Sequence, residues 1–94
     1  MPSSYSAPLR GAIIGCGFFA QFQIEAWRRM PEVELVAACD LDPARAKAAA
    51  PQAYASAEEL FAREELDFVD IATRPESHLA LVELACAQKV PIIC

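Results

Sequence analysis

Apolar and polar residues alternate in blocks along this chain, and the blocks predict alternating strands and helices. Short, nearly continuous apolar runs at residues 9–14, 33–39, 66–72 and 91–94 are typical of strands covered on both faces. Between these runs, apolar residues recur at helical spacing over residues 18–30, 44–50, 57–63 and 75–88. Residues 52–55 predict one further short strand at an edge of the sheet.

Two of the predicted helices have clear amino-terminal signals. Asp42 followed by Pro43 is typical of an N-cap and a first helical residue. Ser56 and Glu59 have the S-x-x-E spacing of a capping box. We therefore expect helices to begin directly after Asp42 and Ser56.

The helical spacing also predicts which side chains face the sheet. In the helix over residues 18–30, we expect Phe19 and Phe22 to pack on the sheet. In the helix over residues 75–88, the expected inward-facing residues are Leu79, Val82, Ala85 and Cys86.

Alternating strands and helices with short connections favour a parallel sheet with right-handed crossovers. The predicted fold class is α/β, a Rossmann-type doubly wound sheet with strand order 3-2-1-4-5 and helices on both faces. In such a sheet, ligands bind where the order reverses, outside the carboxyl ends of the strands. Residues 15–20 and 72–75 should therefore face each other across a cleft.

The composition limits the chain to one small domain. Of its 94 residues, 55% are hydrophobic and 22% charged, which is typical of a folded chain. We expect residues 1–8 to be a flexible leader and residues 9–94 to be the folded domain. The net charge of −5 and scattered basic residues argue against nucleic acid as a partner. No apolar stretch is long enough to predict a membrane span.

The four cysteines are Cys16, Cys39, Cys86 and Cys94, and no two form a C-x-x-C pair. All stand in apolar surroundings, so we expect reduced, buried core residues rather than disulfides or metal ligands. Free thiols of this kind favour a cytoplasmic location.

A glycine-rich turn separates the first predicted strand from the first helix. Gly15 is suited to a sharp turn. Gly17 stands where any Cβ would collide with a bound pyrophosphate, and Ala20 stands where the helix crosses close to the strand. The N–H groups at the start of the helix, including those of Phe18 and Phe19, can hold phosphate oxygens. The turn therefore predicts a dinucleotide site; a tight turn without a ligand is the alternative.

Asp40 ends the second predicted strand and lies at the distance from the turn expected for the acid that binds an adenosine ribose. A 2′-phosphate about 4 Å from this carboxylate would meet a repulsion of roughly 4 kcal/mol at an effective dielectric of about 20. We therefore expect NAD as the cofactor, in preference to NADP. The alternative is that Asp40 is a helix-capping or solvated loop residue.

The loop after the fourth strand supplies the remaining candidate cofactor contacts, which are Ala72, Thr73, Arg74, Pro75 and His78. Thr73 fits a ribose or phosphate contact and equally the first position of a T-x-x-E capping box. Arg74 either contacts the cofactor or faces solvent. His78, the sole histidine, is expected to be a polar loop contact rather than a catalytic base.

Three segments together give a family resemblance. Residues 11–20 (GAIIGCGFFA), 33–40 (VELVAACD) and 69–78 (VDIATRPESH) resemble the signatures of the Gfo/Idh/MocA family, which includes glucose-fructose oxidoreductase and inositol dehydrogenase. The resemblance implies an amino-terminal domain that binds NAD or NADP. It also implies hydride transfer to or from sugars, cyclitols or related polyols, with a second α/β domain supplying most of the substrate site.

The chain departs from the family pattern at its end. The pattern continues into Glu-Lys-Pro, whose lysine is implicated in catalysis, whereas this sequence stops at Cys94. Arg74 also stands where a proline is common, and Gln23 where a histidine is frequent. The resemblance thus implies a dinucleotide-binding domain incomplete at its carboxyl end, with no catalytic residue and no activity by itself.

Two other functions fit the same motifs. One is a free-standing nucleotide-binding or sensing module without catalysis. The other is a methyl-transfer domain that binds S-adenosylmethionine, although its loop more often has G-x-G-x-G spacing than the G-x-G-x-x-A seen here.

Two partners besides the dinucleotide are expected. One is the substrate domain that the family resemblance implies. The other is a second copy of the chain, because Ile92 and Ile93 would form an apolar sheet edge and such edges tend to pair with another chain.

Overall fold

The computed structural model describes residues 8–18, 20–73 and 75–93, without the side chains of residues 75–78. The leader expected at residues 1–8 lies outside the described residues except for Pro8. The elements in chain order are β1 Leu9–Ile14, α1 Ala20–Arg28, β2 Val33–Cys39, α2 Pro43–Ala49, β3 Gln52–Tyr54, α3 Ala57–Arg63, β4 Phe68–Ile71, α4 Pro75–Ala87 and β5 Ile92–Ile93.

The strands form one parallel sheet in the order β3-β2-β1-β4-β5. Ile14, the last residue of β1, lies beside Cys39 of β2 and Ile71 of β4. The carboxyl ends of the three central strands therefore meet at one edge of the sheet. The predicted fold class and strand order are confirmed.

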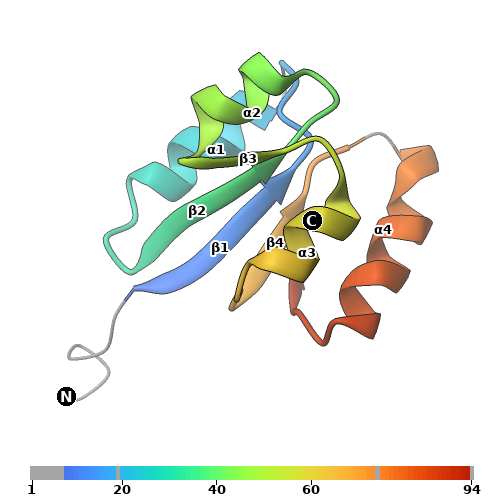
Figure 1. Ribbon diagram of the computed structural model, residues 1–94. Helices are drawn as coiled ribbons and strands as arrows, with labels where there is room; N and C mark the ends of the chain where they lie inside the picture. Colours follow the sequence, from blue (N-terminus) through green and yellow to red (C-terminus); the bar gives the residue numbers. More distant parts are fainter. Residues whose placement is uncertain (1–7, 19, 74, 94) are drawn as a thin grey trace, which may run out of the picture.

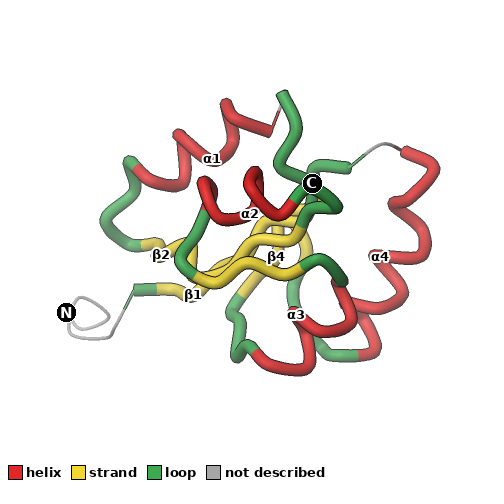
Figure 2. Tube along the Cα trace, turned by 45° about the horizontal axis from the view of Figure 1, so that its top comes forward, coloured by secondary structure: helices red, strands yellow, loops and turns green. Residues whose placement is uncertain are grey.

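Helices cover both faces of the sheet (Figures 1 and 2). On one face, Ile24 of α1 and Ala46 of α2 pack with Ile13 and Leu35. On the other face, Leu60 and Phe61 of α3 lie in a second cluster with residues of the strands and with Ala85 of α4. The many alanines at these contacts let the helices approach the sheet closely.

The predicted helix starts are confirmed by their caps. Asp42 is the N-cap of α2, and its Oδ1 accepts the N–H of Ala44 at 3.0 Å. Ser56 is the N-cap of α3, and its Oγ accepts the N–H of Glu59 at 3.2 Å. Each side chain satisfies an N–H that lacks a partner within the helix.

Some of the predicted inward-facing residues are wrong. Phe22 is 70% exposed, because α1 begins at Ala20 and turns Ala20 and Ile24 into the core instead. On α4, Leu79 is 71% exposed and Cys86 is also exposed, whereas Ala85 is buried and Val82 half-buried as expected. Phe19 lies outside the described residues.

Candidate functional site

A cleft of about 820 Å³ opens at the carboxyl edge of the sheet, between the loops that follow β1, β2, β3 and β4. It is the place where the strand order reverses around β1 and β4, which is where doubly wound sheets bind ligands. The predicted site residues that line it are Gly15, Gly17, Asp40, Ala72 and Thr73. The expectation that the two loops face one cleft is therefore confirmed for residues 15–17, 72 and 73, and for the rest of the two segments it stays a prediction.

Gly15 makes the sharp turn directly after β1. Its φ of +95° is one that residues with a side chain rarely adopt, and a Cβ there would lie 2.9 Å from the backbone carbon of Ala72. The N–H of Gly15 donates to the carbonyl of Cys39 at 2.8 Å, and the N–H of Ala72 donates to the carbonyl of Ile14 at 2.8 Å. Glycine at this position thus lets the ends of β1, β2 and β4 come together.

Gly17 and Ala20 lie on the next part of the turn. A Cβ on Gly17 would point into the cleft, where the nearest atom is Nη1 of Arg45 at 3.9 Å. Ala20 is buried, and its N–H donates to the carbonyl of Gly17 at 3.1 Å. The fold therefore requires glycine at position 15, while the space beside Gly17 is open for a ligand.

Phe18 is described, and Phe19 is not. The Phe18 ring is 75% exposed and packs edge-on against Phe22, with 6.3 Å between ring centroids. The helix begins at Ala20 rather than at the expected residue 18.

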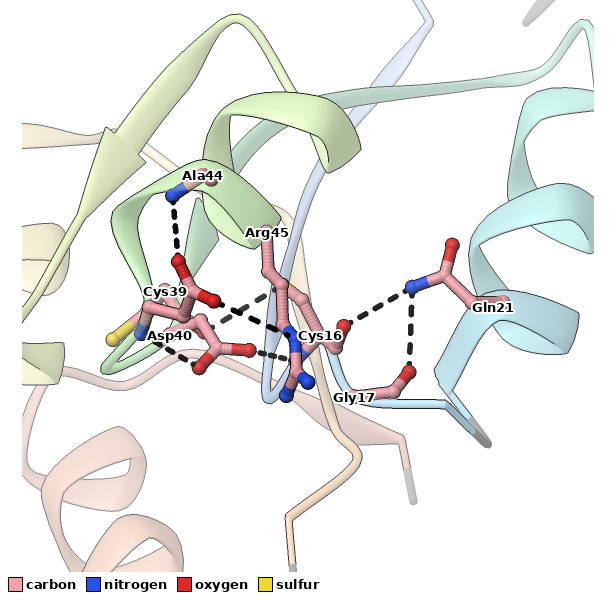
Figure 3. A network of polar contacts seen from close by, with 8 residues as sticks. Cys16, Gly17, Gln21, Cys39, Asp40, Ala44 and Arg45 are labelled. Carbon is pink, nitrogen blue, oxygen red and sulfur yellow. Dashed lines mark hydrogen bonds and ion pairs between the residues drawn. The ribbon is translucent and has the colours of Figure 1, made fainter.

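The two oxygens of the Asp40 carboxylate bond to two different loops, the glycine turn after β1 and the loop after β2 (Figure 3). Its Oδ2 accepts the N–H of Cys16 at 2.9 Å, and its Oδ1 accepts the N–H of Asp42 at 3.0 Å. Because each carboxylate oxygen can accept two hydrogen bonds, Asp40 can still accept hydrogen bonds from a ligand in the cleft that it lines. Asp40 is not the cap of α2, since Asp42 has that role.

Arg45 is a residue of this cleft that the sequence analysis missed. Its side chain extends from α2 toward Cys16 and Gly17 (Figure 3), and its Nε lies 3.7 Å from Oδ2 of Asp42. The only sequence signal is its position, five residues after Asp40 on the next helix. A guanidinium here lies within reach of a phosphate bound at the turn.

Gln21 is a second missed residue. Its side-chain amide donates to the carbonyls of Cys16 and Gly17, at 3.0 and 3.3 Å (Figure 3). The residue is exposed, and its side chain folds back over the turn.

Two buried thiols lie at the turn, that of Cys16 within it and that of Cys39 at the end of β2. Burial raises the pKa of Cys16 to about 12, and the neighbouring Asp40 carboxylate adds to this. Burial likewise raises the pKa of Cys39 to about 11, with further contributions from Asp40 and Glu58. Cys16 and Cys39 are buried as expected, whereas the prediction of burial is wrong for Cys86, which is exposed; that the cysteines are reduced stays a prediction.

The remaining predicted contacts follow β4. Thr73 is half-buried, and its Cγ2 lies close to the position that a Cβ on Gly15 would take. Arg74 lies outside the described residues, and so do the side chains of Pro75 and His78, although Pro75 begins α4. Whether Thr73 caps α4 or contacts a cofactor stays a prediction.

Asp70 forms a buried polar cluster that the sequence analysis did not identify. The residue is 2% exposed, and its carboxyl group accepts hydrogen bonds from Trp27 at 2.8 Å and from Gln23 at 3.1 and 3.3 Å. These contacts join α1 to β4 across 43 and 47 residues of sequence. The cluster is not among the residues that line the cleft.

Two features are absent from the described part of the chain. No group of three or more His, Cys, Asp or Glu residues is placed to hold a metal ion there. None of the helices in that part combines the length and the hydropathy needed to cross a bilayer.

A protein-family model, described as an oxidoreductase family with an NAD-binding Rossmann fold (Gfo/Idh/MocA), matches residues 9–94. Two relatives are D-apiose dehydrogenases. That of Rhizobium rhizogenes is 50% identical over 91 residues, which are 92% of this chain and 26% of that protein. That of Paraburkholderia graminis is 46% identical over 90 residues, 90% of this chain and 24% of that protein.

A solved structure is similar in both sequence and fold. It is an oxidoreductase from Agrobacterium radiobacter in complex with NAD⁺, L-tartaric acid and magnesium, 48% identical with a TM-score of 0.87. The match covers 94% of this chain and 27% of that one. The chain thus spans about a quarter of the length of the relatives it matches.

Proposed function

Because the chain belongs to the Gfo/Idh/MocA oxidoreductase family, we propose that it is the NAD-holding part of an enzyme that oxidises or reduces a sugar or related polyol by hydride transfer. The observation that carries the proposal is the cleft in which Gly17 faces open space beside the acceptor atoms of Asp40. Residues 9–94 would form this dinucleotide-binding domain.

In the proposed pose, the pyrophosphate lies on the glycine turn. Backbone N–H groups at residues 17 and 18 and the amino end of α1 would face it, because a helix start carries partial positive charge. The missing Cβ of Gly17 leaves room for its oxygens, and Arg45 adds a positive charge on the other side. The part of the cofactor that crosses to β4 would contact Ala72 and Thr73. The other proposed contacts are Phe19, Arg74, Pro75 and His78.

The ribose next to adenine would bind Asp40. The carboxylate already accepts the N–H groups of Cys16 and Asp42, which fix its orientation without using all its acceptor capacity. It would accept hydrogen bonds from the two ribose hydroxyls, and it would repel a 2′-phosphate. Arg45 partly offsets that repulsion, so the preference for NAD over NADP depends on the balance of Asp40 and Arg45.

The chemistry of substrate turnover is divided between this chain and the rest of the enzyme. Bound NAD supplies the hydride acceptor. Hydride transfer also needs a substrate held near the nicotinamide and a group that moves a proton, and we assign neither role to a residue of this chain. We propose that the part corresponding to the other three quarters of the relatives supplies both.

The relatives suggest a first substrate to test. Both curated relatives are D-apiose dehydrogenases, at 50% and 46% identity. We therefore propose D-apiose or a similar sugar as the substrate of the whole enzyme. The cytoplasmic location and self-association through β5 that the sequence suggested also remain proposals.

Calorimetry with the 94-residue chain tests the proposal. We expect NAD to bind more tightly than NADP, and S-adenosylmethionine not to bind. We also expect no reduction of NAD when D-apiose is added to the chain alone. Binding of S-adenosylmethionine but not NAD would refute the proposal, and sugar oxidation by the chain alone would refute the division of labour.

A further inference from the structure

The cleft extends beyond Asp40, toward the edge strand β3. Its lining continues from Leu41 to Ser56, Ala57 and Glu58, which follow β3 and begin α3. Since β3 lies beside β2, and β2 beside β1, these residues are the next along the sheet edge after the glycine turn and Asp40. A ligand that runs from the turn past Asp40 reaches the start of α3.

Glu58 carries the functional group at this end of the cleft. Its Oε1 accepts a hydrogen bond from the Ser56 hydroxyl at 3.1 Å, which restricts the side chain. Its carboxylate is close enough to Cys39 to contribute to the raised pKa of that thiol, as Asp40 also does. Both carboxylates therefore border the same small region around the end of β2.

The neighbouring acid on the same helical turn provides a contrast. Glu59 pairs with Arg63, with 3.4 Å between Oε2 and Nη2, and it does not line the cleft. Across the part of the chain that the structure describes, Glu58 has no such ion pair. Its carboxylate thus keeps acceptor capacity for a hydrogen-bond donor in the cleft.

This inference rests on the proposed function, which places the ribose at Asp40 and the pyrophosphate at the turn. The base then lies on the far side of the ribose, toward β3. We infer that Glu58 recognises the adenine base by accepting a hydrogen bond from its 6-amino group. A base with a carbonyl oxygen at that position would present an acceptor to the carboxylate and would be repelled.

The matching pair of probes is NAD and nicotinamide hypoxanthine dinucleotide, whose base has a carbonyl oxygen in place of the 6-amino group and carries a proton on N1. For the unchanged 94-residue chain, we expect calorimetry to give about tenfold tighter binding of NAD. In Glu58→Gln the preference should fall to about twofold or less. The reason is that an amide can offer either its oxygen to adenine or its NH₂ to hypoxanthine.

The control variant is Glu59→Gln, which removes the same charge from the same helical turn. It should keep the tenfold preference, and thermal unfolding should show that both variants stay folded. Equal discrimination in Glu58→Gln and the unchanged chain would overturn the inference, and so would equal binding of both probes by the unchanged chain. Failure of the unchanged chain to bind either dinucleotide would instead overturn the proposed function, and the inference with it.

Discussion

Oδ2 of Asp40 accepts the backbone N–H of Cys16 at 2.9 Å, so the acid at the end of β2 holds the glycine turn at the end of β1. The same carboxylate holds the N–H of Asp42 through Oδ1. A residue expected to bind only the ribose therefore also shapes the surface on which the pyrophosphate would lie.

Asp40→Asn should weaken NAD binding by about ten- to a hundredfold, because a hydrogen bond to a charged group contributes about 1.5–3 kcal/mol. NADP binding should fall less or rise, since the repulsion of the 2′-phosphate disappears while Arg45 remains. Calorimetry with both dinucleotides measures the ratio. Asp42→Asn is the control, because asparagine caps a helix as well as aspartate. An unchanged preference for NAD over NADP in Asp40→Asn would show that Asp40 does not bind the ribose hydroxyls.

The two glycines of the turn should respond differently to alanine. Gly15→Ala places a Cβ at a left-handed φ and 2.9 Å from the Ala72 backbone, so we expect a loss of about 2 kcal/mol and a Tm lower by roughly 10 °C. Gly17→Ala meets no protein atom closer than 3.9 Å, so the Tm should hardly change while NAD affinity drops at least about tenfold. Thermal unfolding and calorimetry on both variants check this. A Gly17→Ala chain that binds NAD normally would contradict the proposed pyrophosphate position.

The buried thiols predict a loss of stability in alkali. Their pKa values are raised from an ordinary 9.0 to about 12 for Cys16 and about 11 for Cys39. A thiol whose pKa is higher in the folded chain stabilises it below pH 9, and the stabilisation is lost as the pH rises toward the folded value. The urea midpoint should therefore fall as the pH rises from about 9 to about 11. Above pH 10, Tyr54 would add to the loss, because its hydrogen bond to Glu64 raises its pKa.

Cys16→Ser separates this effect from general alkaline unfolding. Serine has a similar shape and can still donate to the Cys39 carbonyl, which Sγ of Cys16 approaches to 3.7 Å, but it does not titrate in this range. The variant should show a smaller fall in urea midpoint over the same pH range. The same fall in both chains would mean that Cys16 is not responsible.

Much of the fold was predictable because its signals are local. The apolar runs mark the strands, Asp42 and Ser56 mark helix starts, and Gly15 marks the turn that a residue with a side chain could not make. Each of these depends on residues close together in the sequence. The predicted helix boundaries were therefore correct to within about two residues.

The errors concern contacts between distant segments. The approach of Arg45 to Gly17 depends on how α2 lies over the turn, and no spacing rule predicts it. The helical spacing of apolar residues predicted that Phe22 packs on the sheet, but the smaller Ala20 and the polar Gln23 face the sheet in its place. Gln23 does so because its partner, Asp70, lies 47 residues away on β4.

Trp27→Phe should reveal what the Asp70 cluster contributes to stability. The change removes the indole N–H that donates to Oδ2 of Asp70 at 2.8 Å, so a buried acceptor loses a partner. We expect a loss of about 2 kcal/mol in the free energy of unfolding, measured by urea denaturation and circular dichroism. The control Phe22→Leu, on the exposed side of the same helix, should change it by less than about 0.5 kcal/mol. Equal stability of both variants would mean that the hydrogen bond contributes little.

Self-association through β5 is the remaining prediction. Within the described sheet β5 pairs only with β4, and Ile93 of this edge strand is 44% exposed. An apolar edge with unpaired backbone groups favours addition of a second chain, so the unchanged chain should sediment as a larger species at high concentration. Ile93→Lys should shift it to a monomer, because a charge on an edge strand opposes pairing. Leu9→Lys, which changes an exposed residue of β1, should leave the association intact. A monomer at all concentrations for the unchanged chain would rule the idea out, since the edge would then not be adhesive enough to pair.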